Sequence, residues 1–220
     1  QDNASLVAPS NVTFTAGGPD AWEQIFLDHW SGGDGFSSFP DPFDPSIVYW
    51  TQQQGDLRRG QSGELRRSKH VRPKGPGLRF AWDTPYMASP HTEGVLYCAA
   101  EGVHRSTDRG ESWEAIGPKP WGGSILSLSE SLLDPKRLVT GAGGGRVQLT
   151  RDAGATWERA GDGLPSKRVT KVVTSVHDPE LVYVALSGSS AGDRRSYVFR
   201  SEDFGATWKS LAGNLPNEPV

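Results

Sequence analysis

Two aspartates of this 220-residue chain, Asp34 and Asp83, have neighbours that suit acid–base chemistry. Asp34 lies between Gly33 and Gly35, and a carboxylate among glycines can be presented on an open loop with close backbone access to a ligand. Asp83 follows Trp82 directly. Glycoside hydrolysis needs two carboxyl groups across a cleft, roughly 5 Å apart for retention and roughly 6.5–9.5 Å apart for inversion. Asp34 and Asp83 are therefore candidate catalytic residues. The alternative for each is a carboxylate that caps a turn by accepting hydrogen bonds from nearby backbone amides.

Three aromatic side chains near these aspartates are candidate ligand-binding residues. They are Trp30, Phe36 and Trp82, whose flat rings could stack on sugar rings. Burial in a core between sheets is the alternative, and it is the more common position of a large aromatic residue in an all-β protein.

Metal and cofactor chemistry have no support in the sequence. The five histidines show no ligand spacing and Cys98 is the single cysteine, so we predict no metal site and no cofactor. The glycine-rich run 141–145 looks like a phosphate-binding loop, but it joins two strand-like segments and opens no helix, which predicts a hairpin turn. We expect Cys98 to face a strand interface as a small apolar residue.

A basic stretch begins after position 57. Its cationic residues are Arg58, Arg59, Arg66, Arg67, Lys69, Arg72 and Lys74. One interpretation is an exposed loop or sheet edge, where cations discourage pairing with other sheets. The other is a site for an anionic partner. No aromatic residue interleaves with these charges and the formal net charge is −3, so we expect no nucleic-acid partner.

An eight-residue pattern that occurs three times indicates which elements position these residues. It has the form Ser/Thr-x-Asp-x-Gly-x-Ser/Thr-Trp and starts at positions 106, 150 and 201, which are 44 and 51 residues apart. Asp and hydroxyl side chains can close a tight turn on backbone amides, Gly supplies a positive φ, and Trp supplies a large ring to bury. Repetition in phase predicts a structural role for Ser106, Asp108, Gly110, Trp113, Thr150, Asp152, Gly154, Trp157, Ser201, Asp203, Gly205 and Trp208. We call these three segments the Asp turns.

A second repeat runs in phase with the Asp turns. A proline turn precedes an apolar, β-branched run that ends at positions 49, 97, 139 and 183, with spacings of 48, 42 and 44 residues. In the basic stretch, a degenerate Asp turn would fall around positions 61–64. Short strands repeating every 40–50 residues or so are typical of propeller blades. We predict an all-β chain: a β-propeller of four-stranded blades, forming a partial ring of about four to five blades. The expected blades are residues 1–29 (partial), 30–75, 76–118, 119–164 and 165–213.

Composition agrees with a folded β protein. The chain has 27 Gly and 16 Pro, which is too much for a helical protein, and 35% hydrophobic residues with eight Trp, which suffices for a core. No apolar run approaches the roughly 18 residues that could span a membrane. The chain opens on Gln1-Asp2-Asn3 without a signal peptide, and neither end looks like the cap that a repeat array needs. We therefore expect an excerpt of a longer propeller, or a processed chain, whose remainder is one of its partners.

The Asp turns resemble the Asp-box, or bacterial neuraminidase repeat, of sialidases, sortilin-type receptors and xyloglucan-cleaving glycoside hydrolases. The chain as a whole is similar to exported bacterial Asp-box propeller proteins that are labelled glycosyl hydrolase or sortilin N-terminal-like. The segments that carry this resemblance are Gln1-Asp2-Asn3, Gly32–Phe36, Leu78–Pro85, Phe199–Trp208 and Asn214-Leu215-Pro216. The resemblance implies an exported (periplasmic or extracellular) protein whose Asp turns lie on the outer rim, away from the ligand face.

Two functions fit these observations. The first is a binding or scaffold module that holds a protein or polysaccharide across the ligand face of the propeller. The second is part of a glycoside hydrolase, with Asp34 as acid or base and aromatic residues lining the subsites. Sialidase activity is disfavoured, because the Phe/Tyr-Arg-Ile-Pro motif of that family is absent. A second loop carboxylate facing Asp34 would distinguish an enzyme from a binding module.

Overall fold

The computed structural model describes residues 5–8, 16, 18, 22–25, 34–117, 124–216 and 218. Within them lie 18 strands and five short 3-10 helices. Sixteen of the strands form four sheets of four strands, and in each sheet the neighbours are consecutive along the chain. All pairs are antiparallel, so each sheet is an up-and-down meander. The all-β prediction is confirmed.

Each of the four sheets is built from one continuous stretch of the chain. The first sheet contains β3 (Ser38–Pro40), β4 (Ile47–Gln52), β5 (Asp56–Gln61) and β6 (Lys69–His70); the second β7 (Tyr86–Ala88), β8 (Leu96–Ala99), β9 (Val103–Ser106) and β10 (Glu114–Ala115); the third β11 (Ile125–Glu130), β12 (Leu138–Ala142), β13 (Val147–Thr150) and β14 (Glu158–Arg159); the fourth β15 (Arg168–Thr174), β16 (Val182–Gly188), β17 (Asp193–Ser201) and β18 (Lys209–Ser210). A separate pair joins β1 (Ser5–Val7) and β2 (Glu23–Ile25). The 3-10 helices are η1 (Gln53–Gly55), η2 (Leu65–Arg67), η3 (Gly143–Gly145), η4 (Ser189–Ala191) and η5 (Ala212–Asn214).

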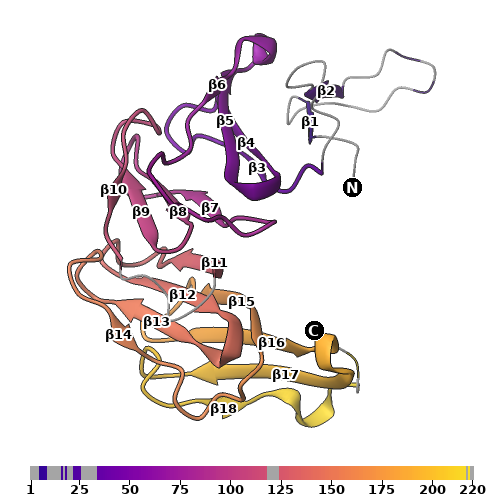
Figure 1. The fold of residues 1–220 in the computed structure, drawn as a ribbon, viewed down its shortest axis with the longest axis vertical. Coiled ribbons are helices and arrows are strands. Elements are labelled where there is room, and N and C mark those ends of the chain that lie inside the picture. The colour runs from indigo at the N-terminus through magenta and orange to yellow at the C-terminus, as the bar shows by residue number, and fades with distance from the viewer. Residues whose placement is uncertain are drawn as a thin grey trace.

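The core lies between the sheets, which succeed one another around an arc (Figure 1). One apolar cluster joins the first and second sheets, a second joins the second and third, and a third joins the third and fourth. Strand β8 buries all of its residues because both of its faces are covered, whereas β16 alternates buried and partly buried residues. Cys98 is fully buried in the first cluster, and burial raises its pKa to about 12, as expected for an inert apolar side chain. The run 141–145 forms the end of β12 and η3, between β12 and β13, so the predicted hairpin connection is confirmed.

Each Asp turn connects the third and fourth strands of its sheet and is closed by the same hydrogen bonds. Ser106 Oγ accepts from Gly110 N at 2.8 Å, while Asp108 accepts from Ser112 N at 2.9 Å and from Ser112 Oγ at 2.5 Å. In the turns at 150 and 201, the bonds from the Gly amide to the first hydroxyl measure 2.9 and 2.7 Å. The bonds from the Thr amide to the Asp carboxylate measure 2.8 Å in both. These carboxylates are therefore occupied by their own turns.

The Asp turns also fasten each sheet to the preceding one. Trp113 Nε1 donates to Val71 O at 2.8 Å, and Trp157 and Trp208 donate to carbonyls of the preceding sheets at 2.7 and 2.5 Å. Gly110 has φ +88°, and a Cβ there would lie 2.8 Å from Val71 Cβ and 2.9 Å from Val71 O. The residue before it, Arg109, also has a positive φ of 57°. The glycine is thus required by both its backbone conformation and its close contact with the neighbouring sheet.

The first sheet, all of which lies within the described residues, has no such turn. Gly60 pairs with Val48 in the register position that Ser106 occupies opposite Leu96 in the second sheet. Strand β5 continues to Gln61, and η2 then precedes β6. By strand pairing, the position at which an Asp turn would begin in the first sheet is therefore Gly60.

A second local motif lies directly after the first strand of every four-stranded sheet and was missed in the sequence. Asp41 Oδ1 accepts from the backbone amides of Phe43 and Asp44 at 2.9 and 3.1 Å. Ser89, Ser131 and Ser175 accept in the same way from the amide two residues later, at 3.2, 3.2 and 3.0 Å. Because Asp and Ser perform the same capping role, residue identity conceals this repeat.

Because Gly110 lies so close to Val71, replacing it with alanine should destabilise the protein more than its left-handed backbone conformation alone would predict. Gly63 has a similar φ of +83° but open space around its Cβ position, which makes Gly63→Ala the matched control. We expect Gly63→Ala to cost about 1–2 kcal/mol, from the left-handed backbone alone. Gly110→Ala should cost about 1–3 kcal/mol more, because Val71 must shift. Urea unfolding of both variants measures the difference, and equal losses would contradict the packing argument.

The Asp turns predict a pH dependence of stability. Hydrogen bonds from the Ser112 hydroxyl and amide hold the pKa of Asp108 at about 2, and Thr156 and Thr207 do the same for Asp152 and Asp203. Since each pKa is lowered in the folded state, the stabilisation is complete above about pH 4 and is lost as the pH falls through about 2. The Asp152→Asn variant should therefore unfold at lower urea than wild type near neutral pH. The gap between the two midpoints should shrink as the pH falls from about 4 to about 2. A gap that does not change with pH would refute this role.

Candidate functional site

Loops from the first two sheets meet at the end of the strands opposite the Asp turns (Figure 1). Asp34 precedes β3, η1 connects β4 to β5, and Trp82 lies in the segment that leads to β7. Gln54 N of η1 donates to Trp82 O at 3.0 Å, and Trp82 Nε1 donates to Asp34 Oδ2 at 3.3 Å. The fold thus brings together two of the predicted site residues, Asp34 and Trp82.

Asp34 and Trp82 differ in how far they are exposed to solvent. The carboxylate of Asp34 belongs to a residue that is only 8% exposed, whereas Trp82 is 55% exposed. The core alternative for Trp82 is therefore wrong. An indole held by its N–H while its surface stays in water can act as a stacking platform for a flat, partly apolar ligand. Asp34 fixes the orientation of the indole through this hydrogen bond and places a carboxylate beside it.

Packing beneath the site holds η1 close to the segment before β7. Gly55 has φ +77°, and a Cβ there would lie 2.3 Å from Phe80 Cδ1, so the backbone touches the ring directly. Tyr86 OH donates to Gly55 O at 2.7 Å. The guanidinium of Arg72 lies 5.4 Å from the centre of the Phe80 ring. These contacts hold η1 against the segment that carries Trp82. They were not predicted from the sequence, because no local pattern links η1 to Phe80.

The other predicted site residues have different positions. Asp83 is exposed and Phe36 is partly buried, with its amide donating to Thr51 O at 3.3 Å. Trp30 lies outside the described residues. Arg79 and Glu101 form an ion pair between the segment that carries Trp82 and the loop after β8. Sequence reasoning missed this pair.

The described part of the chain contains no group of three or more His, Cys, Asp or Glu side chains that could hold a metal ion. In the same residues, no helix has the length and apolar character needed to cross a membrane.

Comparisons with known proteins identify the architecture. No family model matches the chain. The xyloglucanase Xgh74A of Acetivibrio thermocellus is 31% identical over 153 residues, which cover 54% of this chain and 17% of that enzyme. The solved structure of the GH74 xyloglucanase from Xanthomonas campestris superposes with a TM-score of 0.62 at 19% identity, covering 89% of this chain and 32% of that one. An ancestral GH74 enzyme gives a TM-score of 0.63 at 16% identity, covering 83% of this chain and 24% of that one.

These similarities confirm the predicted fold. The chain is a β-propeller segment whose four described four-stranded sheets form a partial ring. It spans less than a third of the length of the three relatives named above. The predicted resemblance to xyloglucan-cleaving hydrolases is confirmed, since the chain is similar in sequence to a xyloglucanase.

The contact between Asp34 and Trp82 predicts an energetic coupling between the two residues. In a double-mutant cycle of Asp34→Ala and Trp82→Phe, we expect a coupling of about 0.5–1.5 kcal/mol from the lost hydrogen bond. The control cycle pairs Trp82→Phe with Asp162→Ala, an exposed aspartate after β14 of the third sheet, which should couple by less than about 0.5 kcal/mol. Unfolding in urea gives all the free energies needed. Equal coupling in the two cycles would show that Asp34 does not hold the indole.

Proposed function

We propose that this chain is a polysaccharide-binding segment of an exported propeller protein, and that the loops around Asp34 and Trp82 contact the polysaccharide. The observation that carries the proposal is the exposed Trp82 ring, fixed by a nearly buried carboxylate at a junction of two sheets. Binding sites for sugars combine an apolar face with a few placed polar groups, and this junction offers both. The similarity to xyloglucanases favours a β-glucan with xyloglucan-like branching as the ligand.

A second candidate function is a contribution to glycoside hydrolysis. Asp34 is the carboxylate that favours it, because it lies at the junction, is nearly buried and has a hydrogen-bonded orientation. Hydrolysis needs a second carboxyl group across the cleft. Asp83 remains the proposed partner within this chain, and the remainder of a longer propeller could supply another.

Binding of a xyloglucan oligosaccharide tests the proposal. We expect saturable binding by isothermal titration, and a loss of about tenfold or more in affinity in Trp82→Ala, because the stacking surface is removed. The control is Trp22→Ala, since Trp22 is similarly exposed at 56% but lies in another part of the chain. Equal effects of the two substitutions would refute a site at Trp82.

Release of reducing sugar from the same polysaccharide separates binding from catalysis. If Asp34 is catalytic, Asp34→Asn should abolish turnover while the oligosaccharide still binds. Binding without turnover in wild type would leave the binding module as the function of this segment. Turnover that survives Asp34→Asn would exclude Asp34 from the chemistry.

A further inference from the structure

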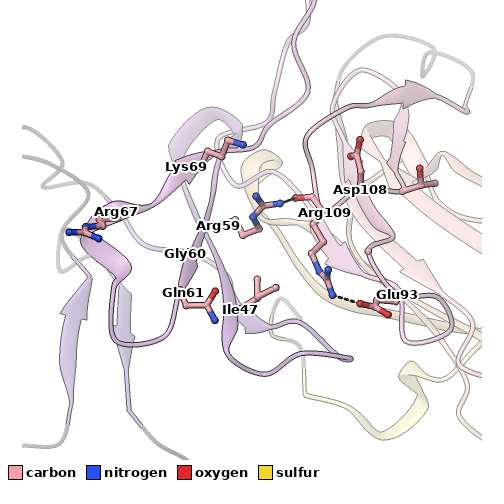
Figure 2. Close-up of a pocket in the computed structure, with 11 residues that line it drawn as sticks. Ile47, Arg59, Gly60, Gln61, Arg67, Lys69, Glu93, Asp108 and Arg109 are labelled. Atoms are coloured by element: carbon pink, nitrogen blue, oxygen red, sulfur yellow. Dashed lines mark hydrogen bonds and ion pairs between the residues drawn. The ribbon is translucent and has the colours of Figure 1, made fainter.

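A groove of about 660 Å³ lies between the first and second sheets (Figure 2). Its lining includes residues of the first Asp turn, so it lies at the end of the strands opposite Asp34 and Trp82. One wall comes from β4, β5 and the segment of η2 and β6, and the other from the loops around Glu93 and the first Asp turn. The lining residues are Ile47, Arg59, Gly60, Gln61, Arg67, Lys69, Glu93, Gly94, Thr107, Asp108 and Arg109. The groove is distinct from the proposed polysaccharide site.

The groove coincides with the place where the repeat is broken. Gly60 takes the position of the Ser or Thr that opens each Asp turn, and a Cβ there would lie 2.9 Å from Trp50 Cη2. Trp50 and Leu65 fill this space as a small apolar cluster with Val48. The first sheet has therefore exchanged its Asp turn for a different connection, and this connection brings cations to the groove. Departures from a local rule are expected at functional sites.

Two cations on one wall share a single carboxylate. Glu111 Oε1 lies 2.7 Å from Arg59 Nη2 and 2.5 Å from Lys69 Nζ. The side chain of Glu111 is 43% exposed, so it is an internal counter-ion at the surface that water can reach. Arg59 also donates from Nη1 to Arg109 O at 2.7 Å, which holds its guanidinium in the groove. An incoming carboxylate could take the position of Glu111 with both cations already placed.

The remaining charges of the groove have defined partners. Arg109 pairs with Asp41 at 3.0 Å and with Glu93 at 2.6 Å, as Figure 2 shows for Glu93. Asp108 is occupied by its own turn. Arg67, with 83% of its side chain exposed, forms a long ion pair of 3.5 Å with Glu64. Such a weak, solvated pair leaves Arg67 accessible to a second acidic group further along the groove.

We propose that this groove binds an acidic peptide segment of a partner protein, whose carboxylate replaces Glu111 between Arg59 and Lys69. Arginine suits this role because its planar fork binds a carboxylate in two places. Among the described residues, none that lines the groove is aromatic, so this part of the chain offers no stacking platform of the kind that a sugar or a nucleic-acid base would use. Side chains on both walls suit an extended peptide, which can place alternate residues against each wall.

Fluorescence anisotropy of a labelled peptide in which Asp alternates with Ser tests the proposal on the 220-residue chain. We expect saturable binding that weakens as salt rises from about 50 to about 500 mM. Lys69→Gln should weaken binding by about tenfold, because a cation of the site is lost. Glu111→Gln should strengthen binding, because the internal competitor is removed. Lys209→Gln is the control and should leave binding unchanged, since Lys209 is also an exposed, ion-paired lysine but lies in the fourth sheet.

The sign of the Glu111→Gln effect is decisive. If Arg59, Lys69 and Glu111 only stabilise the fold, this substitution would lower the melting temperature without improving peptide affinity. Absence of binding at low salt would overturn the proposal. So would displacement of the peptide by equimolar inorganic phosphate, because the groove would then hold free anions rather than a peptide.

Discussion

The contact of each Asp turn with the preceding sheet is the interaction on which the rest of this structure depends. A four-stranded meander has two faces and cannot bury either one alone, so each sheet must be fixed against a neighbour. The indole of Trp113 does this by donating to Val71 O, while Gly110 allows the backbones to approach. The same device recurs at Trp157 and Trp208. Because it sets the position of each sheet relative to the previous one, it also sets where the loops at the far end of the strands meet.

The first sheet lacks an Asp turn within its described residues, and its rim differs accordingly. Its third strand continues past Gly60, and Trp50 packs where the turn hydroxyl would lie. Trp113 of the second sheet still donates to Val71 O, so the two sheets remain in contact although the first sheet has no Asp turn at its own edge. Beside this packing lies a groove whose lining, among the described residues, includes four cationic and two acidic side chains. The departure from the repeat thus coincides with a groove that carries charged side chains from both sheets.

Sequence repeats predicted the parts of the fold that are local. The Asp turns and the proline turns each occupy a few consecutive residues, so their chemistry is visible in the sequence alone. The contact between Asp34 and Trp82 is different, because it joins residues 48 positions apart and depends on how two sheets are placed. The capping role shared by Asp41 and Ser89 escaped notice because two residue types perform it. The groove escaped notice because its second wall comes from the next sheet, although its basic residues were recognised.

The two ends of the strands are under unequal constraint, and this argues for the site at Asp34 and Trp82. At the end that carries the Asp turns, three of the four described sheets use the same turn, and all four use the same cap after their first strand. At the other end, the connection before β7 spans residues 71–85, whereas the one before β15 spans only 160–167. The longer connection carries Phe80, Trp82 and the ion pair of Arg79 with Glu101. The longer connection thus contributes the exposed Trp82 ring that contacts the Asp34 carboxylate. Loops on a rigid scaffold are where recognition is usually built.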